Sequence, residues 1–144
     1  MQRRNFIRLV GGGSVVAATA AASLAVALRP DLPAEAVQAW RGPLDETEPR
    51  RRALAYAITA PNPHNLQPWR VELRERDTIT VLTDPQRVLP ETDPMGRQIL
   101  IGHGAFIELL VIALAEQGLR SEVSLWPQGE LPSDLRLWNE RPVA

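Results

Sequence analysis

The chain has 144 residues, with 16 basic side chains against 17 acidic ones and no cysteine. The length allows one domain, and the lack of cysteine excludes disulfides, thiol nucleophiles, iron–sulfur clusters and cysteine-ligated zinc. All the basic residues are arginines, and residues 37–144 hold 12 of them against 15 acidic residues, a net charge of −3. This balance argues against nucleic-acid binding, which requires a basic face.

The N-terminus carries two adjacent arginines, Arg3 and Arg4, and a phenylalanine two residues later. An uncharged run rich in glycine and alanine follows over residues 9–28. Together they resemble a twin-arginine export signal, whose arginines are read by the twin-arginine translocase. The run is also long enough to span a bilayer, so a membrane anchor is the alternative. We expect residues 1–36 to be a signal peptide or anchor plus linker, and residues 37–144 to form an exported, periplasmic or otherwise extracytoplasmic domain.

Two short helices are expected before residue 61. The first covers residues 34–41 and ends at a Gly-Pro pair. The second covers about residues 47–60, with acidic residues before its first turn and a proline after its last. The run Arg50–Arg52 lies at its beginning, where positive charge opposes the helix dipole. This placement indicates either an anion partner or a solvated face with acidic neighbours.

The ten residues 60–69 read Ala-Pro-Asn-Pro-His-Asn-Leu-Gln-Pro-Trp and form the most informative stretch of the chain. Three prolines fix φ and remove backbone donors, so the stretch cannot be a helix or a central strand and is expected to be a rigid connector. Its carboxamides, Asn62, Asn65 and Gln67, each present a donor beside an acceptor. A ring edge that alternates the two, such as a flavin edge, would suit them. A plain proline-rich turn is the alternative interpretation.

Beyond this connector the pattern changes to a period of two. Val71 and Leu73 alternate with charged residues, and a second alternating run follows over residues 78–83. The two runs predict an antiparallel hairpin with its turn at residues 76–77. The loop over residues 84–96 is polar and contains three prolines, which is typical of ligand-facing loops.

The strongest helix is expected over residues 97–117, because apolar residues recur there at intervals of three and four and Gly118 follows as a cap. Its middle is apolar nearly all round, which predicts a buried central helix or an oligomer interface. Gly102 and Gly104, near its start, would allow a backbone or a ring to approach closely.

Two further strands are expected after this helix. Residues 121–126 alternate and predict a third strand, and residues 141–144 predict the beginning of another, so that the domain is expected to be incomplete. No G-x-G-x-x-G, P-loop, H-E-x-x-H or G-x-S-x-G motif is present. The two histidines, His64 and His103, do not have a metal-ligand spacing, so no metal site is expected.

Two motifs, in this order, resemble the nitroreductase superfamily of FMN oxidoreductases, and most closely its Acg-type branch. The first is Ala-Pro-x-x-His-Asn-x-Gln-Pro-Trp, at residues 60–69. The second is Asp-Pro-x-x-Arg-Gln, at residues 93–98, where the long apolar helix opens. The resemblance covers about residues 40–144.

The resemblance implies a nitroreductase-like α+β fold, an antiparallel-rich sheet packed with helices, of which this chain would hold the N-terminal part. It also implies FMN at a dimer or pseudo-dimer interface. The residues that it marks as flavin contacts are Pro61, Asn62, Pro63 and Asn65. By the same resemblance Gln67 and Trp69 anchor the loop to the sheet. His64 is expected to have a structural or loop-bonding role, with flavin contact as the alternative.

The function implied by the resemblance is transfer of hydride or electrons from NAD(P)H, through flavin, to a small acceptor such as a nitroaromatic or a quinone. The flavin supplies that chemistry, so no residue of this chain is expected to be catalytic. The Arg-x-Ser segment that binds the FMN phosphate in many nitroreductases is not found at the expected distance before Pro61. The later region of the family carries part of the cofactor site, so these 144 residues alone are not expected to be active.

Two alternatives to an FMN-dependent enzyme remain open from the sequence. One is a non-catalytic protein of the same fold that binds or sequesters flavin. The other is a membrane-anchored interaction domain without a cofactor.

Overall fold

The computed structural model describes residues 33–43 and 45–144. Arg3, Arg4 and the uncharged run after them lie outside the described residues. Contacts divide the chain into Met1–Ala36 and Val37–Ala144, and the architecture below is that of the second unit. A short 3₁₀ helix, η1, covers Ala34–Arg41, as the sequence predicts, and exposes Trp40 to solvent.

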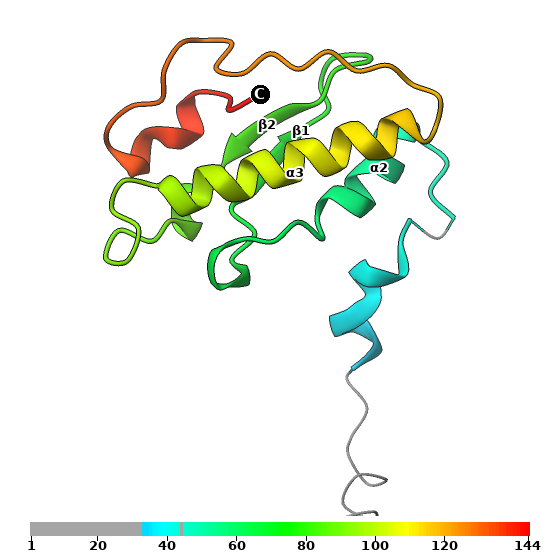
Figure 1. Cartoon of the computed structure of the whole chain (residues 1–144), viewed down its shortest axis with the longest axis horizontal. Coiled ribbons are helices and arrows are strands. Elements are labelled where there is room, and N and C mark those ends of the chain that lie inside the picture. The colour runs from blue at the N-terminus through cyan, green and yellow to red at the C-terminus, as the bar shows by residue number, and fades with distance from the viewer. Residues whose placement is uncertain (1–32, 44) are drawn as a thin grey trace, which may run out of the picture. The chain divides into compact units, whose positions relative to one another are not determined.

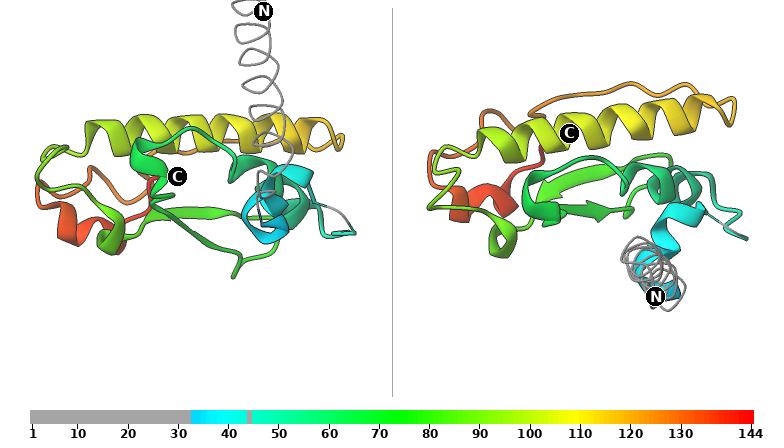
Figure 2. Two further views of the ribbon diagram at one scale, coloured as in Figure 1. Left: turned by 90° about the horizontal axis from the view of Figure 1, so that it is seen from below. Right: turned by 60° about the horizontal axis from the view of Figure 1, so that its bottom comes forward.

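The second unit combines helices with one small antiparallel sheet, which agrees with the α+β class predicted from the sequence. Helix α3 lies across one face of the hairpin formed by β1 and β2, and α2 packs against α3 (Figures 1 and 2). The elements after η1 are α2 (Pro49–Ala57), η2 (Pro63–Asn65), β1 (Trp69–Glu72), β2 (Thr80–Thr83), η3 (Pro85–Arg87), α3 (Arg97–Ala115) and η4 (Leu135–Glu140).

Helix α2 is shorter than the sequence predicts, and its caps explain both ends. The carboxylate of Glu48 accepts a hydrogen bond from the backbone N–H of Arg51 at 2.8 Å, and Pro49 takes the first helical position, where no backbone donor is needed. After Ala57 the backbone tightens, and the N–H of Ala60 donates to the carbonyl of Ala57 at 3.0 Å. Residues 58–60 therefore form a turn that delivers the chain to the proline-rich connector.

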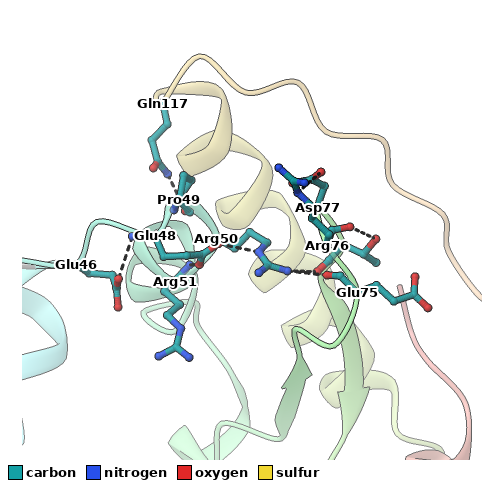
Figure 3. A network of polar contacts seen from close by, with 10 residues as sticks. Glu46, Glu48, Pro49, Arg50, Arg51, Glu75, Arg76, Asp77 and Gln117 are labelled. Carbon is teal, nitrogen blue, oxygen red and sulfur yellow. Dashed lines mark hydrogen bonds and ion pairs between the residues drawn. The ribbon is translucent and has the colours of Figure 1, made fainter.

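The first turn of α2 is tied to the hairpin turn by one arginine (Figure 3). Arg50 donates to Glu48 at 2.8 Å and to the backbone carbonyls of Glu75 and Thr78 at 2.8 and 3.0 Å. The hydrogen bond from Arg50 holds the pKa of Glu48 below its ordinary value. Arg50 is thus not a free anion ligand, because its guanidinium joins an acidic neighbour to the hairpin turn. Arg51 and Arg52 are exposed, as expected for a solvated face.

The predicted hairpin is confirmed. Strands β1 and β2 pair antiparallel, with Trp69 opposite Thr83 and Val71 opposite Val81. Trp69, Val71 and Val81 pack in the main core with α2 and α3. The alternation in the sequence therefore places one face of the hairpin against the helices.

Helix α3 is the central helix that the sequence predicts, and it ends close to the expected Gly118, which has φ of +75°. Its buried residues are Ile99, Gly102, His103, Phe106, Ile107, Leu110, Ala113 and Leu114. Among the described helices, α3 is long and apolar enough to cross a membrane, a property that core helices share. Eight of its 19 residues are buried, which accounts for part of this composition.

The prediction of a strand at residues 121–126 is wrong. The segment runs back along α3 as an irregular trace (Figure 1), and its one backbone contact with a later element is the N–H of Trp126 donating to Val143. Val123 and Leu125 are exposed. Alternation alone cannot make a strand, because the backbone donors and acceptors need a neighbouring strand to pair with.

The last residues of the chain bind to β2, as expected for the beginning of a strand. The hydrogen bonds involve one residue of β2, Val81. The N–H of Val81 donates to the carbonyl of Ala144 at 2.8 Å, and the carbonyl of Val81 accepts from Val143 at 2.7 Å. A second, smaller cluster lies at the other end of α3, where Ile99 packs with Leu135 and Trp138.

Candidate functional site

The connector at residues 60–69 adopts a backbone that L-residues rarely choose. His64, Asn65 and Gln67 have φ of +51°, +53° and +50°. Positive φ costs a non-glycine residue about 1 kcal/mol or more, and such residues gather where a surrounding structure holds a loop for binding. Three of them within four residues make this the most strained stretch among the described residues.

Hydrogen bonds inside the loop hold this conformation. The side chain of Asn62 accepts from the backbone N–H of Gln67 at 2.7 Å and donates to the carbonyl of Ala60 at 3.0 Å. The side chain of Gln67 donates to the carbonyl of Ile58 at 3.4 Å, at the end of α2. Two of the three carboxamides noted in the sequence therefore build the loop.

An arginine from the next loop fixes the same stretch from outside. Arg87, at the end of η3, donates to the carbonyls of Leu66 and Gln67 at 3.1 and 3.4 Å, and its Nε lies 3.3 Å from a carboxylate oxygen of Asp84. The backbone N–H of Asp84 donates to Pro68 at 2.7 Å. Sequence reasoning missed this role of Arg87, because it lies 20 and 21 residues along the chain from the carbonyls that it binds.

The end of the loop is anchored in the core by aromatic packing. The ring of Trp69 lies 4.7 Å from that of Phe106, centre to centre, and meets His103 edge-on at 6.4 Å. His103 is fully buried, with Nδ1 at 2.9 Å from the carbonyl of Ile99 and Nε2 at 3.4 Å from the hydroxyl of Thr83. Burial lowers the pKa of His103, which favours the neutral form of the ring in this apolar setting.

The start of the loop rests on α3 at a glycine. A Cβ added to Gly102 would lie 3.3 Å from Cβ of Asn62 and 3.6 Å from the carbonyl oxygen of Pro61. The close backbone approach predicted for Gly102 is therefore observed, and the loop itself is what approaches. Gly104 has no such neighbour within 4 Å among the described residues.

The four residues that the resemblance marks as flavin contacts all lie on this loop. Pro61 and Asn65 are exposed, and Asn62 and Pro63 are partly buried. Within residues 33–43 and 45–144, the side chains of His64 and Asn65 make no hydrogen bond, so both offer polar atoms to solvent. The loop thus has an inner side that secures it and an outer side that presents Pro61, His64 and Asn65.

Gln67 and Trp69 anchor the loop, but they attach it to the helices and not, as was expected, only to the sheet. Gln67 holds the loop to the end of α2, and Trp69 packs on Phe106 of α3 besides opening β1. The helices therefore secure the loop as much as the sheet does, because they lie over its buried side.

The second motif, at residues 93–98, starts a helix in this structure. One carboxylate oxygen of Asp93 accepts from the N–H groups of Gln98 and Ile99 at 2.9 and 3.1 Å, and the side chain is buried. Gly96, with φ of +66°, turns the chain into α3. The motif therefore positions the helix on which the connector rests.

Two cavities lie among the described residues at places that do not involve residues 60–69. The larger, of about 500 Å³, lies between α3, the hairpin and residues 119–124; the smaller, of about 360 Å³, lies beside Trp126 and Trp138. Over the described part of the chain, no group of three or more histidine, aspartate or glutamate side chains could hold a metal. The candidate site is thus one exposed wall, formed by the outer side of the loop.

Comparison with known proteins gives relatives for part of the chain. It is 36% identical over 89 residues to "Putative NAD(P)H nitroreductase acg" of Mycobacterium tuberculosis, an alignment that covers 62% of this chain and 27% of the relative. From the same organism, "Putative NAD(P)H nitroreductase Rv3131" is 33% identical over 82 residues, or 57% and 24% of the two chains. "Uncharacterized protein Rv3127" is 31% identical over 96 residues, or 65% and 28%.

The chain spans about a quarter of the length of the curated relatives it matches. No family model matches it, and no solved structure matches it. The relatives' names support the nitroreductase resemblance that the two motifs carry.

Proposed function

We propose that this chain contributes one wall of an FMN site in a nitroreductase-like oxidoreductase. In the proposed reaction, NAD(P)H reduces the flavin and a small acceptor, such as a nitroaromatic or a quinone, is reduced in turn. The observation that carries the proposal is the connector at residues 60–69, which is strained, secured on its inner side and polar on its outer side. Its support from comparison is the likeness to two proteins whose names begin "Putative NAD(P)H nitroreductase".

The exposed residues of the connector fit one edge of a flavin ring. Asn65 can donate and accept side by side at an exposed position, and the exposed ring of Pro61 supplies an apolar surface nearby. Asn62 and Pro63 would act mainly by holding this backbone in place. Bound flavin would supply hydride transfer, and these residues would position it.

The phosphate end of the cofactor is not accounted for by this loop. Arg50 is committed to Glu48 and to the hairpin turn, which agrees with the lack of a phosphate-binding segment in the sequence. A complete site therefore requires residues beyond the loop, and a homodimer or pseudo-dimer interface is the arrangement we propose for it.

Replacing Asn65 with alanine is expected to lower the amount of flavin that copurifies with the full-length native protein, by more than His64→Ala does. The reason is that Asn65 presents both a donor and an acceptor to a flavin edge. Flavin content would be measured from the visible absorbance of each purified variant per mole of protein. Gln128→Ala, which removes another exposed carboxamide, is the control and should retain normal flavin.

Equal flavin content in the Asn65 and His64 variants would contradict the assignment of Asn65. A full-length protein that is colourless without any substitution would rule out the flavin site altogether. A yellow protein whose flavin is not bleached by NADH or NADPH would favour a flavin-sequestering protein of the same fold.

We also propose that the protein is exported through the twin-arginine translocase. Replacing both Arg3 and Arg4 with lysine is expected to leave it in the cytoplasm, because the receptor reads the arginine pair. Fractionation of cells that express each form measures this. Unchanged localisation would instead favour a simple membrane anchor at the uncharged run.

A further inference from the structure

One of the two histidine rings lies wholly inside the core. His103 is 0% exposed, whereas His64 is exposed. Its Nδ1 lies 2.9 Å from the carbonyl oxygen of Ile99, and its Nε2 lies 3.4 Å from the hydroxyl of Thr83, which is also fully buried. Trp69 meets the ring edge-on, with the ring centres 6.4 Å apart. The ring therefore lies between α3, the end of β2 and the tryptophan with which the connector ends.

Within residues 33–43 and 45–144, no charged side chain contacts the ring of His103. The charged side chains on the elements packed around it and in the adjoining loops are Arg70, Glu72, Asp84, Arg87, Asp93, Arg97 and Glu108. Glu72 pairs with arginines of its own hairpin, Asp84 pairs with Arg87, and Asp93 accepts from two backbone N–H groups. Glu108 is exposed. A protonated His103 would therefore be a cation without a counter-charge.

The burial of His103 makes its protonation unfavourable in the folded arrangement. Burial lowers the pKa of His103 below its ordinary value of about 6.5, and the backbone hydrogen bonds with Ile99 and Leu82 oppose this to a smaller extent. An opened form, in which water reaches the ring, has the ordinary pKa and so binds more protons as the pH falls below about 6.5. Acid therefore promotes opening, and the folded arrangement is favoured above that pH.

The connector is the part of this surrounding that opens most readily. Strand β2 is hydrogen-bonded on both sides, to β1 and, at Val81, to the last residues of the chain. The connector instead holds three residues at positive φ, and opening releases that strain. It reaches the ring through Trp69, and it rests on the neighbouring Gly102. Release of Trp69 would thus uncover one edge of the His103 ring.

We propose that His103 and Trp69 form an acid-sensitive latch, in which protonation of His103 releases Trp69 and the connector from α3 while the rest of the fold is kept. The latch is closed above about pH 6.5 and opens as the pH falls below it. The proposal does not depend on flavin, because the contacts that carry it lie within the chain.

Hydrogen exchange of the connector amides at pH 7.5 and pH 5.5 tests the latch. The amides of Leu66 and Gln67 are bonded inside the connector, to the carbonyl of Pro63 at 3.1 Å and to the side chain of Asn62 at 2.7 Å. Each measured rate, divided by the rate of an unprotected amide at the same pH, gives the opening constant. It is expected to rise about tenfold between the two pH values, a window in which histidine is the side chain that ordinarily titrates.

Two matched variants assign the effect to one histidine. His103→Gln keeps a donor and an acceptor but cannot become charged, so the rise should fall to less than about threefold. His64→Gln removes the exposed histidine and should leave the tenfold rise unchanged. In the unsubstituted protein, the nuclear magnetic resonance signal of the His103 ring should stay at its neutral position down to pH 5.5.

A rise of less than about threefold in the unsubstituted protein would overturn the proposal, as would the same tenfold rise in His103→Gln. A His103 ring that is protonated near pH 6.5 with the connector amides unchanged would overturn it without any variant. An equal rise at the amide of Leu110, in the middle of α3, would overturn it as well, because the fold would then open as a whole and not at the latch.

Discussion

Gly96→Ala is expected to lower the free energy of unfolding by about 2 kcal/mol or more. Gly96 has φ of +66°, which by itself costs a non-glycine residue about 1 kcal/mol or more. Its added Cβ would also overlap the ring of Trp138 and lie 2.8 Å from Cδ2 of Leu135. Such overpacking costs about 1–3 kcal/mol in addition. Urea unfolding followed by circular dichroism measures the change.

Alanine substitutions at two other glycines separate the cost of backbone strain from the cost of overpacking. Gly118 has φ of +75° with no described atom within 4 Å of an added Cβ, so Gly118→Ala should cost only the backbone strain, about 1 kcal/mol. Gly104 lies within α3 with no neighbour in that range, so Gly104→Ala should stabilise the protein by about 0.5–1 kcal/mol. If Gly96→Ala cost no more than Gly118→Ala, the packing of η4 around the start of α3 would be contradicted.

Phe106→Ala is expected to lower the free energy of unfolding by about 3–5 kcal/mol, the usual cost of removing a buried aromatic ring. Phe106 is 0% exposed and carries the ring of Trp69 on its own ring. A domain of this size is stable by only about 5–15 kcal/mol, so a large part of its stability would be lost. Trp69 would lose its support, and the amides of the connector should exchange faster.

Thermal unfolding measures the first effect and hydrogen exchange the second. Ile112→Ala is the control on the same helix, because Ile112 is 48% exposed and its truncation should change stability by about 0.5 kcal/mol or less. A Phe106→Ala protein with unchanged exchange at residues 60–69 would show that α3 does not secure the connector.

The local elements were predictable because their signals are local. The proline at the start of α2, the period of two in β1 and β2, and the apolar spacing of α3 each act through neighbours in the sequence. The residues at which these elements begin and end were less predictable. Helix α2 ends at Ala57 and not at residue 60, because the backbone tightens into a turn before Pro61.

Alternation at residues 121–126 shows where local reasoning fails. The same pattern that forms β1 leaves this segment irregular, because a strand is completed only by a neighbour that takes its backbone hydrogen bonds. Arg50 is a similar case, since the sequence indicated an anion partner or a solvated face with acidic neighbours but not the carbonyls of Glu75 and Thr78. Both outcomes depend on contacts between distant parts of the chain.

The sequence by itself determined that residues 60–69 form a rigid connector rich in carboxamides, because proline restricts φ wherever it stands. Only the tertiary structure decided which of those side chains face outward. Asn62 and Gln67 are used by the loop and by α2, Arg87 holds the loop from outside, and Asn65 is left exposed. The physical reason is that a hydrogen bond requires its partners at about 3 Å, and folding alone brings residues 20 positions apart to that distance.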